Sequence, residues 1–342
     1  MTRKPAGRPD GGSSFTPASA TRLLVALAFT ALTSCRGAGD SVSAPLRPGP
    51  ATPIAAPVNT RIAFVSTRDG APYIYLTNGD GSITRLTQGE KPAWSWDGRK
   101  IAFEYWSSGI PHDGVLQVRV INADGSGEQV VAANASAPAW SPDGTRIVFT
   151  SLDGGGIFAI NADGSGLTRL LGADFDDPGA GDGLVTPTFS PDGRSIAFGV
   201  SNWEKVSQIF VMNADGSAPR RLTVNSAASG PVWSAYGPVW SPDGSMIALV
   251  SQSIGTINAD GSGFRIYPDL NAFDLDWSPD GRSLIFGAFT SPAGELITRG
   301  SRTRIWVLDR TSGAVRQLIP EAIAPVMADY ADASAVWARA NP

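Results

Sequence analysis

One ten-residue pattern recurs along this 342-residue chain and constrains the fold more than any other feature. It opens with an aromatic residue, continues with Ser-Pro-Asp-Gly or a close variant, and ends in a short apolar run. The copies are WSWDGRKIAF (94–103), WSPDGTRIVF (140–149), FSPDGRSIAF (189–198), WSPDGSMIAL (240–249) and WSPDGRSLIF (277–286). Their aromatic residues stand 37 to 51 positions apart. Self-similarity at this period is typical of propellers and solenoids.

A second motif alternates with the first and decides between these two architectures. It reads NGDGS at 78–82, NADGS at 122–126, 161–165, 213–217 and 258–262, and DRTSG at 309–313. SPDG places its Pro and Gly as a type I turn does, and NADGS supplies the residues of another tight turn. The runs after SPDG alternate polar and apolar residues, which predicts half-buried strands. Four antiparallel strands in about 40 residues make one propeller blade.

The two ends of the repeat region supply one more blade between them. The region begins with RIAFVS (61–66), a second strand without a first, and ends with SAVWA (334–338), a first strand without a second. Pairing of these two strands would complete a sixth blade and remove the open edges of an unclosed array. We therefore expect an all-β, six-bladed propeller over residues 61–338, with four-stranded antiparallel blades.

The N-terminal segment has the layout of an export signal. Basic residues precede the apolar run LLVALAFTAL (23–32), which is too short to cross a bilayer as a helix. LTSC (32–35) then resembles the bacterial lipoprotein signal, which predicts a signal peptide at 1–34 and acylation of Cys35. The alternative is an ordinary secretory signal. Residues 35–60 are rich in Pro, Ala and Gly and are expected to form a flexible tether.

Composition narrows the range of partners. Cys35 is the only cysteine, so a mature lipidated chain would have no disulfide, and its stability would come from packing. Loss of residues 1–34 leaves 23 basic and 30 acidic residues, a net charge of −7, which gives no electrostatic footprint for nucleic acid. We expect a monomer that is lipid-anchored in the bacterial cell envelope, in the periplasm or on the outer surface.

These repeats resemble those of the TolB-like family of WD40-like β-propellers. The resemblance covers roughly residues 61–338 and rests on the repeated turn motifs quoted above. It implies a propeller fold and an envelope location, because TolB belongs to the Tol–Pal envelope system. Similar repeats also occur in prolyl-oligopeptidase-type enzymes. Neither an α/β domain before the repeats nor a hydrolase domain after them is recognisable, so we expect a stand-alone propeller. The activities of those relatives do not follow from the fold.

Residues that recur once per blade are expected to be structural. The aromatic anchors should pack between blades, and the turn aspartates should accept hydrogen bonds within their own turns. The anchors are Trp94, Trp140, Phe189, Trp240, Trp277 and Trp337, and the turn aspartates are Asp97, Asp143, Asp192, Asp243 and Asp280. Calcium needs more oxygen ligands than one NADGS turn offers, so we expect no cofactor, with calcium or another divalent metal as the alternative.

Strand direction divides the connections between two faces. In an antiparallel blade the SPDG and NADGS turns fall on one face, here called the turn face. The irregular connections fall on the other, here called the variable face. Binding residues collect on loops that a rigid scaffold holds, so we expect the site on the variable face near the central channel. The candidate partner-binding residues are Tyr105, Trp106, His112, Asp176, Asp177, Trp203, Trp233, Tyr236, Arg299, Arg302 and Tyr330.

No catalytic motif accompanies these residues. The sequence contains no G-x-S-x-G elbow, H-E-x-x-H, P-loop or G-x-G-x-x-G, and its single histidine excludes most His-based metal triads. The first hypothesis is therefore a non-catalytic propeller that binds an envelope protein or peptide. One alternative is a carbohydrate-active or metal-dependent enzyme, a lyase or hydrolase, on the same face. Another is a sensor or assembly factor that binds a small ligand in the channel.

Overall fold

The computed structural model of the protein describes residues 61–339 apart from 79–81, 173–174, 176–182, 202–206, 224–235, 251–252, 268–269, 271, 291–295, 297–301 and 319–331. The chain divides into two units, Met1–Ala44 and Pro45–Pro342, and every described residue belongs to the second. Outside the described residues lie the predicted signal, Cys35, the tether, Asp176, Asp177, Trp203, Trp233, Arg299 and Tyr330. No helix that could span a membrane occurs in the described part of the chain.

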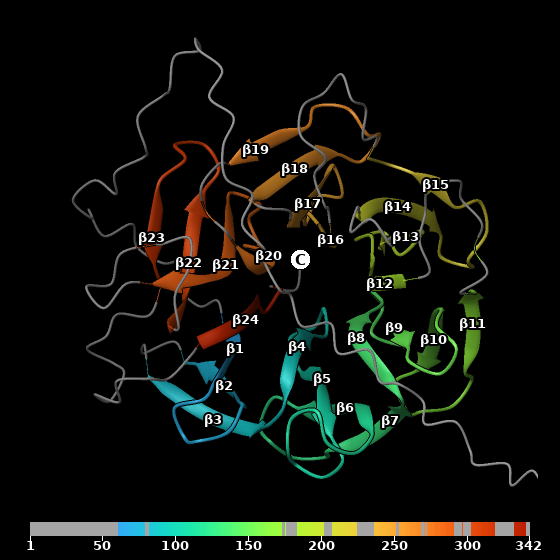
Figure 1. Cartoon of the computed structure of the whole chain (residues 1–342), viewed down its shortest axis with the longest axis vertical. Helices are drawn as coiled ribbons and strands as arrows, with labels where there is room; N and C mark the ends of the chain where they lie inside the picture. Colours follow the sequence, from blue (N-terminus) through green and yellow to red (C-terminus); the bar gives the residue numbers. More distant parts are fainter. Residues whose placement is uncertain are drawn as a thin grey trace, which may run out of the picture. The chain divides into compact units, whose positions relative to one another are not determined.

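Six four-stranded antiparallel sheets, numbered here as blades 1 to 6, are arranged in a ring (Figure 1). Blade 1 contains β24 (Asp332–Trp337), β1 (Ile62–Ser66), β2 (Tyr73–Thr77) and β3 (Ile83–Gln88). Blade 2 contains β4 (Glu90–Trp94), β5 (Lys100–Trp106), β6 (Leu116–Asn122) and β7 (Gln129–Ala133). Blade 3 contains β8 (Ala135–Trp140), β9 (Arg146–Ser151), β10 (Ile157–Asn161) and β11 (Thr168–Leu171).

The other three blades follow the same order from the innermost to the outermost strand. Blade 4 contains β12 (Gly183–Phe189), β13 (Ser195–Ser201), β14 (Ser207–Asn213) and β15 (Arg220–Arg221). Blade 5 contains β16 (Tyr236–Trp240), β17 (Met246–Val250), β18 (Ile254–Asn258) and β19 (Arg265–Tyr267). Blade 6 contains β20 (Phe273–Trp277), β21 (Ser283–Thr290), β22 (Arg302–Asp309) and β23 (Val315–Gln317). The predicted all-β, six-bladed propeller is confirmed.

Strands from the two ends of the repeat region close the ring, as the sequence predicts. β24 pairs antiparallel with β1, so that Trp337 lies opposite Ile62 and Val336 lies opposite Ala63. In Figure 1 the red β24 lies beside the blue β1 at the same blade. Because β24 occupies the inner edge of β1, neither strand leaves that edge open for pairing with another chain.

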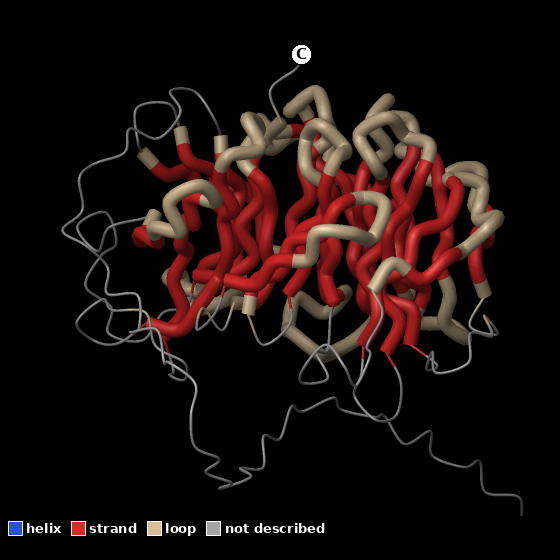
Figure 2. The backbone as a smooth tube through the Cα atoms, turned by 90° about the horizontal axis from the view of Figure 1, so that it is seen from above, coloured by secondary structure: helices blue, strands red, loops and turns tan. Residues whose placement is uncertain are grey.

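The two sets of turns share one face, as predicted. In each SPDG turn the Gly N–H bonds the Ser carbonyl oxygen, as Gly144 does with Ser141 at 2.9 Å. The NADGS turn beside it is tied to the same place, because Ala162 N donates to the Thr145 carbonyl oxygen at 2.9 Å. Figure 2 shows the strands running between the two faces, with short turns along the upper edge.

Six hydrophobic clusters make up the described core, one at each boundary between adjacent blades. One example joins Val118 and Val120 of blade 2 to Trp140 and Phe149 of blade 3. The prediction of half-buried strands after SPDG is wrong, since β9 buries neighbouring residues such as Ile147 and Val148 completely. Both faces of an inner strand are covered because each blade packs against a neighbour on either side.

Candidate functional site

The innermost strands of the six blades, β24, β4, β8, β12, β16 and β20, stand side by side around the channel. Each has a break in its pairing register just before its aromatic anchor. At this break Lys91, Ala137, Thr186 and Asp274 adopt positive φ angles of 45°, 52°, 48° and 48°. Such bulges redirect side chains and are common next to functional sites. Here they lie at residues that line the channel.

A cavity of about 230 Å³ occupies the channel and has two unlike walls. The wall from β8, β12 and β16 is uncharged and includes Ala137, Pro138, Ala139, Thr186, Pro187, Thr188, Gly237, Pro238 and Val239. The charged lining residues are Lys91 on β4, Asp274 and Asp276 on β20, and Arg339 just after β24. Because β20, β24 and β4 are neighbours in the ring, these charges gather on one side of the channel.

Asp276 and Arg339 form a buried pair in this charged wall. Arg339 Nη2 lies 3.7 Å from Asp276 Oδ1, and their side chains are 16% and 8% exposed. Asp276 Oδ2 also accepts a hydrogen bond of 3.0 Å from the backbone N–H of Trp337. Burial raises the pKa of Asp276, against the opposing effect of Arg339. Burial likewise lowers the pKa of Arg339. Each group is desolvated, and the other offsets part of that cost.

Arg339 also stacks on an aromatic ring. Its guanidinium carbon lies 4.1 Å from the centroid of the Trp96 ring, a cation–π distance. Trp96 and Arg339 each stand two residues after an aromatic anchor, where the other four blades have the Pro of SPDG. Trp96 and Arg339, which stand where the repeat has proline, thus contact each other at the turn-face side of the channel.

A second charged group lies nearer the variable face. Lys91 Nζ is 3.3 Å from Glu104 Oε1, and the same oxygen accepts a 2.7 Å hydrogen bond from the backbone N–H of Ala137. Glu104 is buried, whereas about half of the Lys91 side chain is exposed. Burial lowers the pKa of Lys91, but Glu104 and Asp274 together raise it above its ordinary value. Lys91 therefore stays charged at the channel mouth.

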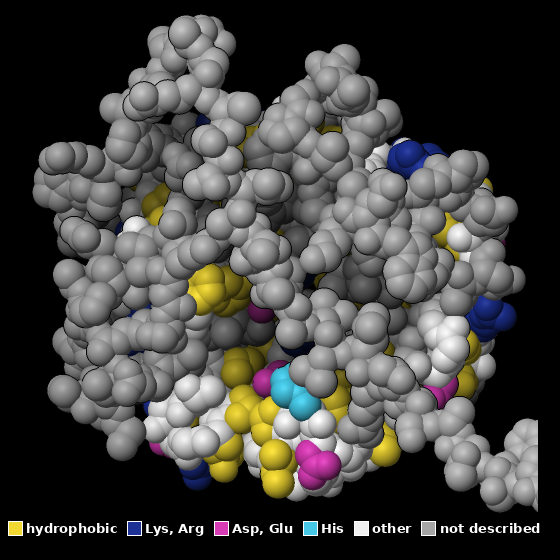
Figure 3. Space-filling model, viewed as in Figure 1, with side chains coloured by type: hydrophobic (Ala, Val, Ile, Leu, Met, Phe, Trp, Pro, Cys, Tyr) yellow, Lys and Arg dark blue, Asp and Glu magenta, His cyan; other side chains and the backbone are white. Residues whose placement is uncertain are grey.

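The predicted residues Trp106 and His112 come together beside this mouth. Their ring centroids are 5.4 Å apart. Neighbouring Glu90 has a raised pKa, through burial and the charge of Glu104, although His112 and Lys91 lower it. Sequence reasoning found no partner for His112, and the structure supplies the Trp106 ring. Figure 3 shows the face that carries the histidine, with acidic and hydrophobic side chains beside it.

The loop that holds His112 is internally bonded. Ser107 N donates to the Val115 carbonyl oxygen at 2.9 Å, and Val115 N donates to Ser107 Oγ at 2.9 Å. Gly109 N donates to the Trp106 carbonyl oxygen at 2.7 Å. His112 itself has a φ of 64°. The segment 107–115, here called the blade 2 loop, is therefore fixed by its own backbone before any partner binds.

Tyr105 has a different surrounding from its neighbour Trp106. The guanidinium carbon of Arg119 lies 3.8 Å from the Tyr105 ring centroid, and Arg119 Nη1 also contacts Glu128 Oε1 at 2.7 Å. Tyr105 thus packs within blade 2. Two other predicted residues, Tyr236 at the start of β16 and Arg302 at the start of β22, are described only in their backbone.

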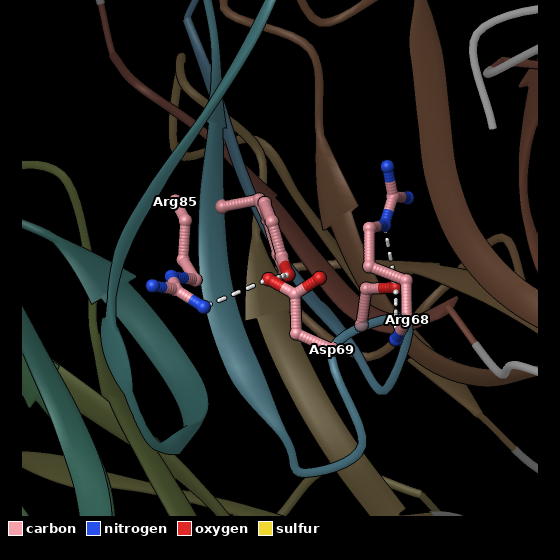
Figure 4. Close-up of polar contacts among 5 residues, drawn as sticks. Arg68, Asp69 and Arg85 are labelled. Carbon is pink, nitrogen blue, oxygen red and sulfur yellow. Dashed lines mark hydrogen bonds and ion pairs between the residues drawn. The ribbon is translucent and has the colours of Figure 1, made fainter. Parts of the chain in front are cut away.

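A polar cluster on the variable face of blade 1 was not predicted (Figure 4). The Tyr75 hydroxyl donates to Asp69 Oδ2 at 2.6 Å, and Arg85 Nη1 lies 3.0 Å from the same oxygen. The Tyr75 hydroxyl and Arg85 lower the pKa of Asp69. Burial, together with Asp69, raises the pKa of Tyr75. Arg68 covers the Tyr75 ring at 4.9 Å. These contacts satisfy one another, so the cluster fixes the β1–β2 loop.

The repeated turn aspartates bond within their own turns. In the blade 3 turn, Asp143 Oδ1 accepts from Ser141 Oγ at 2.6 Å and from Thr145 N at 3.0 Å. Asp97, Asp192, Asp243 and Asp280 repeat this arrangement. The NADGS turns do the same through residues such as Asp163, which accepts from Ser165. No group of three or more His, Cys, Asp or Glu placed to hold a metal occurs among the described residues.

Sequence reasoning missed the channel residues because it did not consider the three positions before each anchor. Those tripeptides read KPA, APA, TPT, GPV, DLD and SAV. Charge appears in only two of them, at Lys91, Asp274 and Asp276. These charges differ from the repeat, and Arg339 stands in the place of a turn proline. Together they were the features of the sequence that could have indicated the channel site.

Comparison with known families agrees with this geometry. The family model described as the TolB beta propeller domain matches residues 90–298, more than half of the chain. The chain belongs to the TolB beta-propeller family. The match covers blades 2 to 5 entirely and the first two strands of blade 6, β20 and β21.

Solved structures extend the likeness of this TolB-type propeller to most of the chain. TolB from Acinetobacter baumannii is 18% identical with a TM-score of 0.63, and the alignment covers 84% of this chain and 69% of that one. A chain from a nidogen–laminin complex is 11% identical with a TM-score of 0.59, and covers 83% of this chain and 100% of that one. At such identities the likeness shows the fold alone.

One curated relative carries a detectable sequence match. An uncharacterised peptidase of Bacillus subtilis (strain 168), YuxL, is 31% identical over 108 residues. The match covers 30% of this chain but only 15% of the peptidase. The chain therefore corresponds to a small part of that relative.

Proposed function

We propose that this TolB-type propeller is an envelope protein that binds a protein or peptide partner through its variable face, at the blade 2 loop. Export with a lipid anchor at Cys35 is part of the proposal and rests on the N-terminal sequence. The proposal also takes the chain to be a monomer. The family supports it at the level of fold, and the nidogen–laminin neighbour is a propeller found in a protein complex.

Apolar exposure on the blade 2 loop carries the proposal. Ile110 is 59% exposed and Val115 is 38% exposed, and both stand in the same loop as His112. Leu152, in the β9–β10 loop of the adjacent blade, is 52% exposed. Exposed apolar side chains in the loop that follows Trp106, next to a charged channel mouth, are typical of a protein interface with an aromatic centre and polar rim.

The internal bonds of the loop support the same conclusion. A loop that is already ordered loses less conformational entropy on binding than a free one, which increases affinity. Gln88 Nε2 adds a further anchor by donating to the Gly109 carbonyl oxygen at 2.5 Å. The blade 2 loop thus presents Ile110 and His112 on a fixed framework.

Site-specific photo-cross-linking in producing cells tests this proposal. A photoreactive residue at Ile110 should trap one defined protein. The matched control is the same residue at Leu167, which is 61% exposed but precedes the outermost strand of blade 3. Ile110→Ser should weaken binding of the trapped protein to the purified chain about tenfold or more while the melting temperature stays unchanged. Identical products from both positions would disprove the variable-face site.

The anchor is tested separately. Wild-type chain grown with labelled palmitate should carry the label and sediment with membranes, and Cys35→Ala should lose both properties. Unlabelled wild-type chain would refute lipidation without bearing on the partner site.

A further inference from the structure

The buried pair of Asp276 and Arg339 is unbalanced in hydrogen-bonding capacity. Asp276 accepts a hydrogen bond from the backbone N–H of Trp337 at Oδ2, and its Oδ1 faces Arg339. An arginine offers five N–H donors and no acceptor. Arg339 makes a 3.7 Å contact with Asp276 through Nη2, and its Nη1 is buried without a hydrogen-bond partner among the described residues. Arg339 therefore has hydrogen-bond donors that no described residue uses.

Arg339 itself lines a cavity of suitable size and polarity. Arg339 lines the 230 Å³ channel cavity, and so does Thr186, whose Oγ1 is also buried and unpartnered within the described part of the chain. Leaving a buried charged donor unpaired is costly, so this arrangement favours an acceptor that enters the cavity. The opposite wall also contains Pro138, Pro187 and Pro238, whose rings offer apolar surface to a ligand.

We propose that the propeller channel binds a small organic carboxylate, held by Arg339 through its carboxylate and by the proline wall through its apolar body. A carboxylate is favoured over a neutral carbonyl because hydrogen bonds between two charged groups are the stronger ones. A cation is disfavoured because Arg339 already places a positive charge beside Asp276 and would repel a second one. A cavity of this volume is below the range that takes drug-sized ligands, so the body is that of a small metabolite or of one terminal residue.

Matched acid and amide probes test the carboxylate requirement. Hexanoate and hexanamide have the same chain length, and calorimetric titration of the full chain should show hexanoate binding about tenfold or more tightly. A second pair, N-acetylated trialanine with a free or an amidated C-terminus, identifies the source. Tighter binding of the free-acid peptide than of hexanoate indicates a peptide C-terminus, and the reverse order indicates a free metabolite.

Two variants that each remove one positive charge from the lining locate the donor. Arg339→Gln should weaken hexanoate binding about tenfold or more and leave hexanamide unaffected. Lys91→Met is the charge-matched control, and it should leave hexanoate affinity near the wild-type value because Lys91 is already paired with Glu104. Equal losses in both variants would overturn the assignment to Arg339.

Arg339→Gln can also destabilise the pair with Asp276, so a third variant leaves the pair intact. Thr188→Phe, on the opposite wall, should fill the cavity and abolish hexanoate binding without loss of folding.

The proposal is wrong if hexanoate and hexanamide bind wild-type protein equally. It is also wrong if neither binds, since water alone would then satisfy Arg339. Ile110→Ser should leave hexanoate binding intact, which separates this site from the proposed partner site.

Discussion

The backbone N–H of Trp337 donates a 3.0 Å hydrogen bond to Oδ2 of Asp276, which joins the last strand of the propeller to the inner strand of the neighbouring blade. Trp337 stands opposite Ile62 in the strand pairing that closes the ring. The bond therefore connects ring closure to the charged wall of the channel.

The first prediction concerns the charge of Asp276. Arg339→Met leaves the buried carboxylate of Asp276 without its counter-charge, and breaking a buried pair in this way should lower the free energy of unfolding by about 3 kcal/mol. Asp274→Asn is the control, because Asp274 is exposed on the same strand, and it should change stability by less than about 1 kcal/mol. Urea unfolding of both variants measures the difference. Similar midpoints for the two would show that the buried pair does not stabilise closure.

The second prediction concerns the aromatic anchors. Trp140 Nε1 donates to the Ala93 carbonyl oxygen of the preceding blade at 3.1 Å, whereas Trp240 Nε1 is buried without a partner among the described residues. Trp140→Phe removes ring area and this bond, but Trp240→Phe removes ring area alone. Trp140→Phe should therefore cost about 1 kcal/mol more in unfolding free energy. Thermal and urea unfolding check the order, which equal costs would contradict.

The third prediction concerns acid. Hydrogen bonds from Ser141 and Thr145 hold the pKa of Asp143 below its ordinary value. The pKa values of Asp192 and Asp243 are lowered in the same way. A lowered folded-state pKa gives stability that is present above the unfolded value, about 4, and is lost as pH falls through the folded value. The wild-type unfolding free energy should therefore drop below about pH 4.

Asp276 acts in the opposite direction. Its pKa is raised by burial, so its protonated form favours the folded state, and this contribution is lost as pH rises through the folded value.

Asp143→Ala tests the lowered pKa of the turn aspartate. It should lose about 1 kcal/mol at pH 7 and less at pH 3, because the stability that comes with a lowered pKa falls with pH. Urea titrations at both pH values measure this, with Asp113→Ala as an exposed control. A pH-independent loss would mean that the charge of Asp143 is unimportant.

The fourth prediction compares two turn glycines. Gly216 and Gly144 have φ angles of +88° and +68°, so alanine at either pays about 1 kcal/mol for the left-handed backbone. A Cβ on Gly216 would also collide with the carbonyl oxygen of Leu170 in blade 3, whereas one on Gly144 meets nothing within 4 Å. Gly216→Ala should therefore lower the melting temperature more than Gly144→Ala. The same shift in both would show that blade 4 can move away from blade 3.

Local chemistry explains what could be predicted for the fold. SPDG and NADGS encode turns through Pro, Gly and short polar side chains, which act on their own backbone regardless of context. Because the two motifs alternate, they predicted a blade of four strands as the repeating unit. The incomplete units at 61–66 and 334–338 predicted that the two end strands pair and close the ring. The burial of Ile147 and Val148 on both faces of β9 was missed, because alternation describes one strand and not the neighbouring blade.

The sequence by itself determined the turns, the number of blades and the pairing of β24 with β1, because each is written in residues that repeat. Only the tertiary structure decided that Lys91, Asp274, Asp276 and Arg339 share one wall of the channel. These residues lie near opposite ends of the repeat region, and ring closure is what makes β20, β24 and β4 neighbours. The repeated residues specify each blade locally. The channel site, in contrast, is made of residues that differ from the repeat, and these come close together only when the ring is closed.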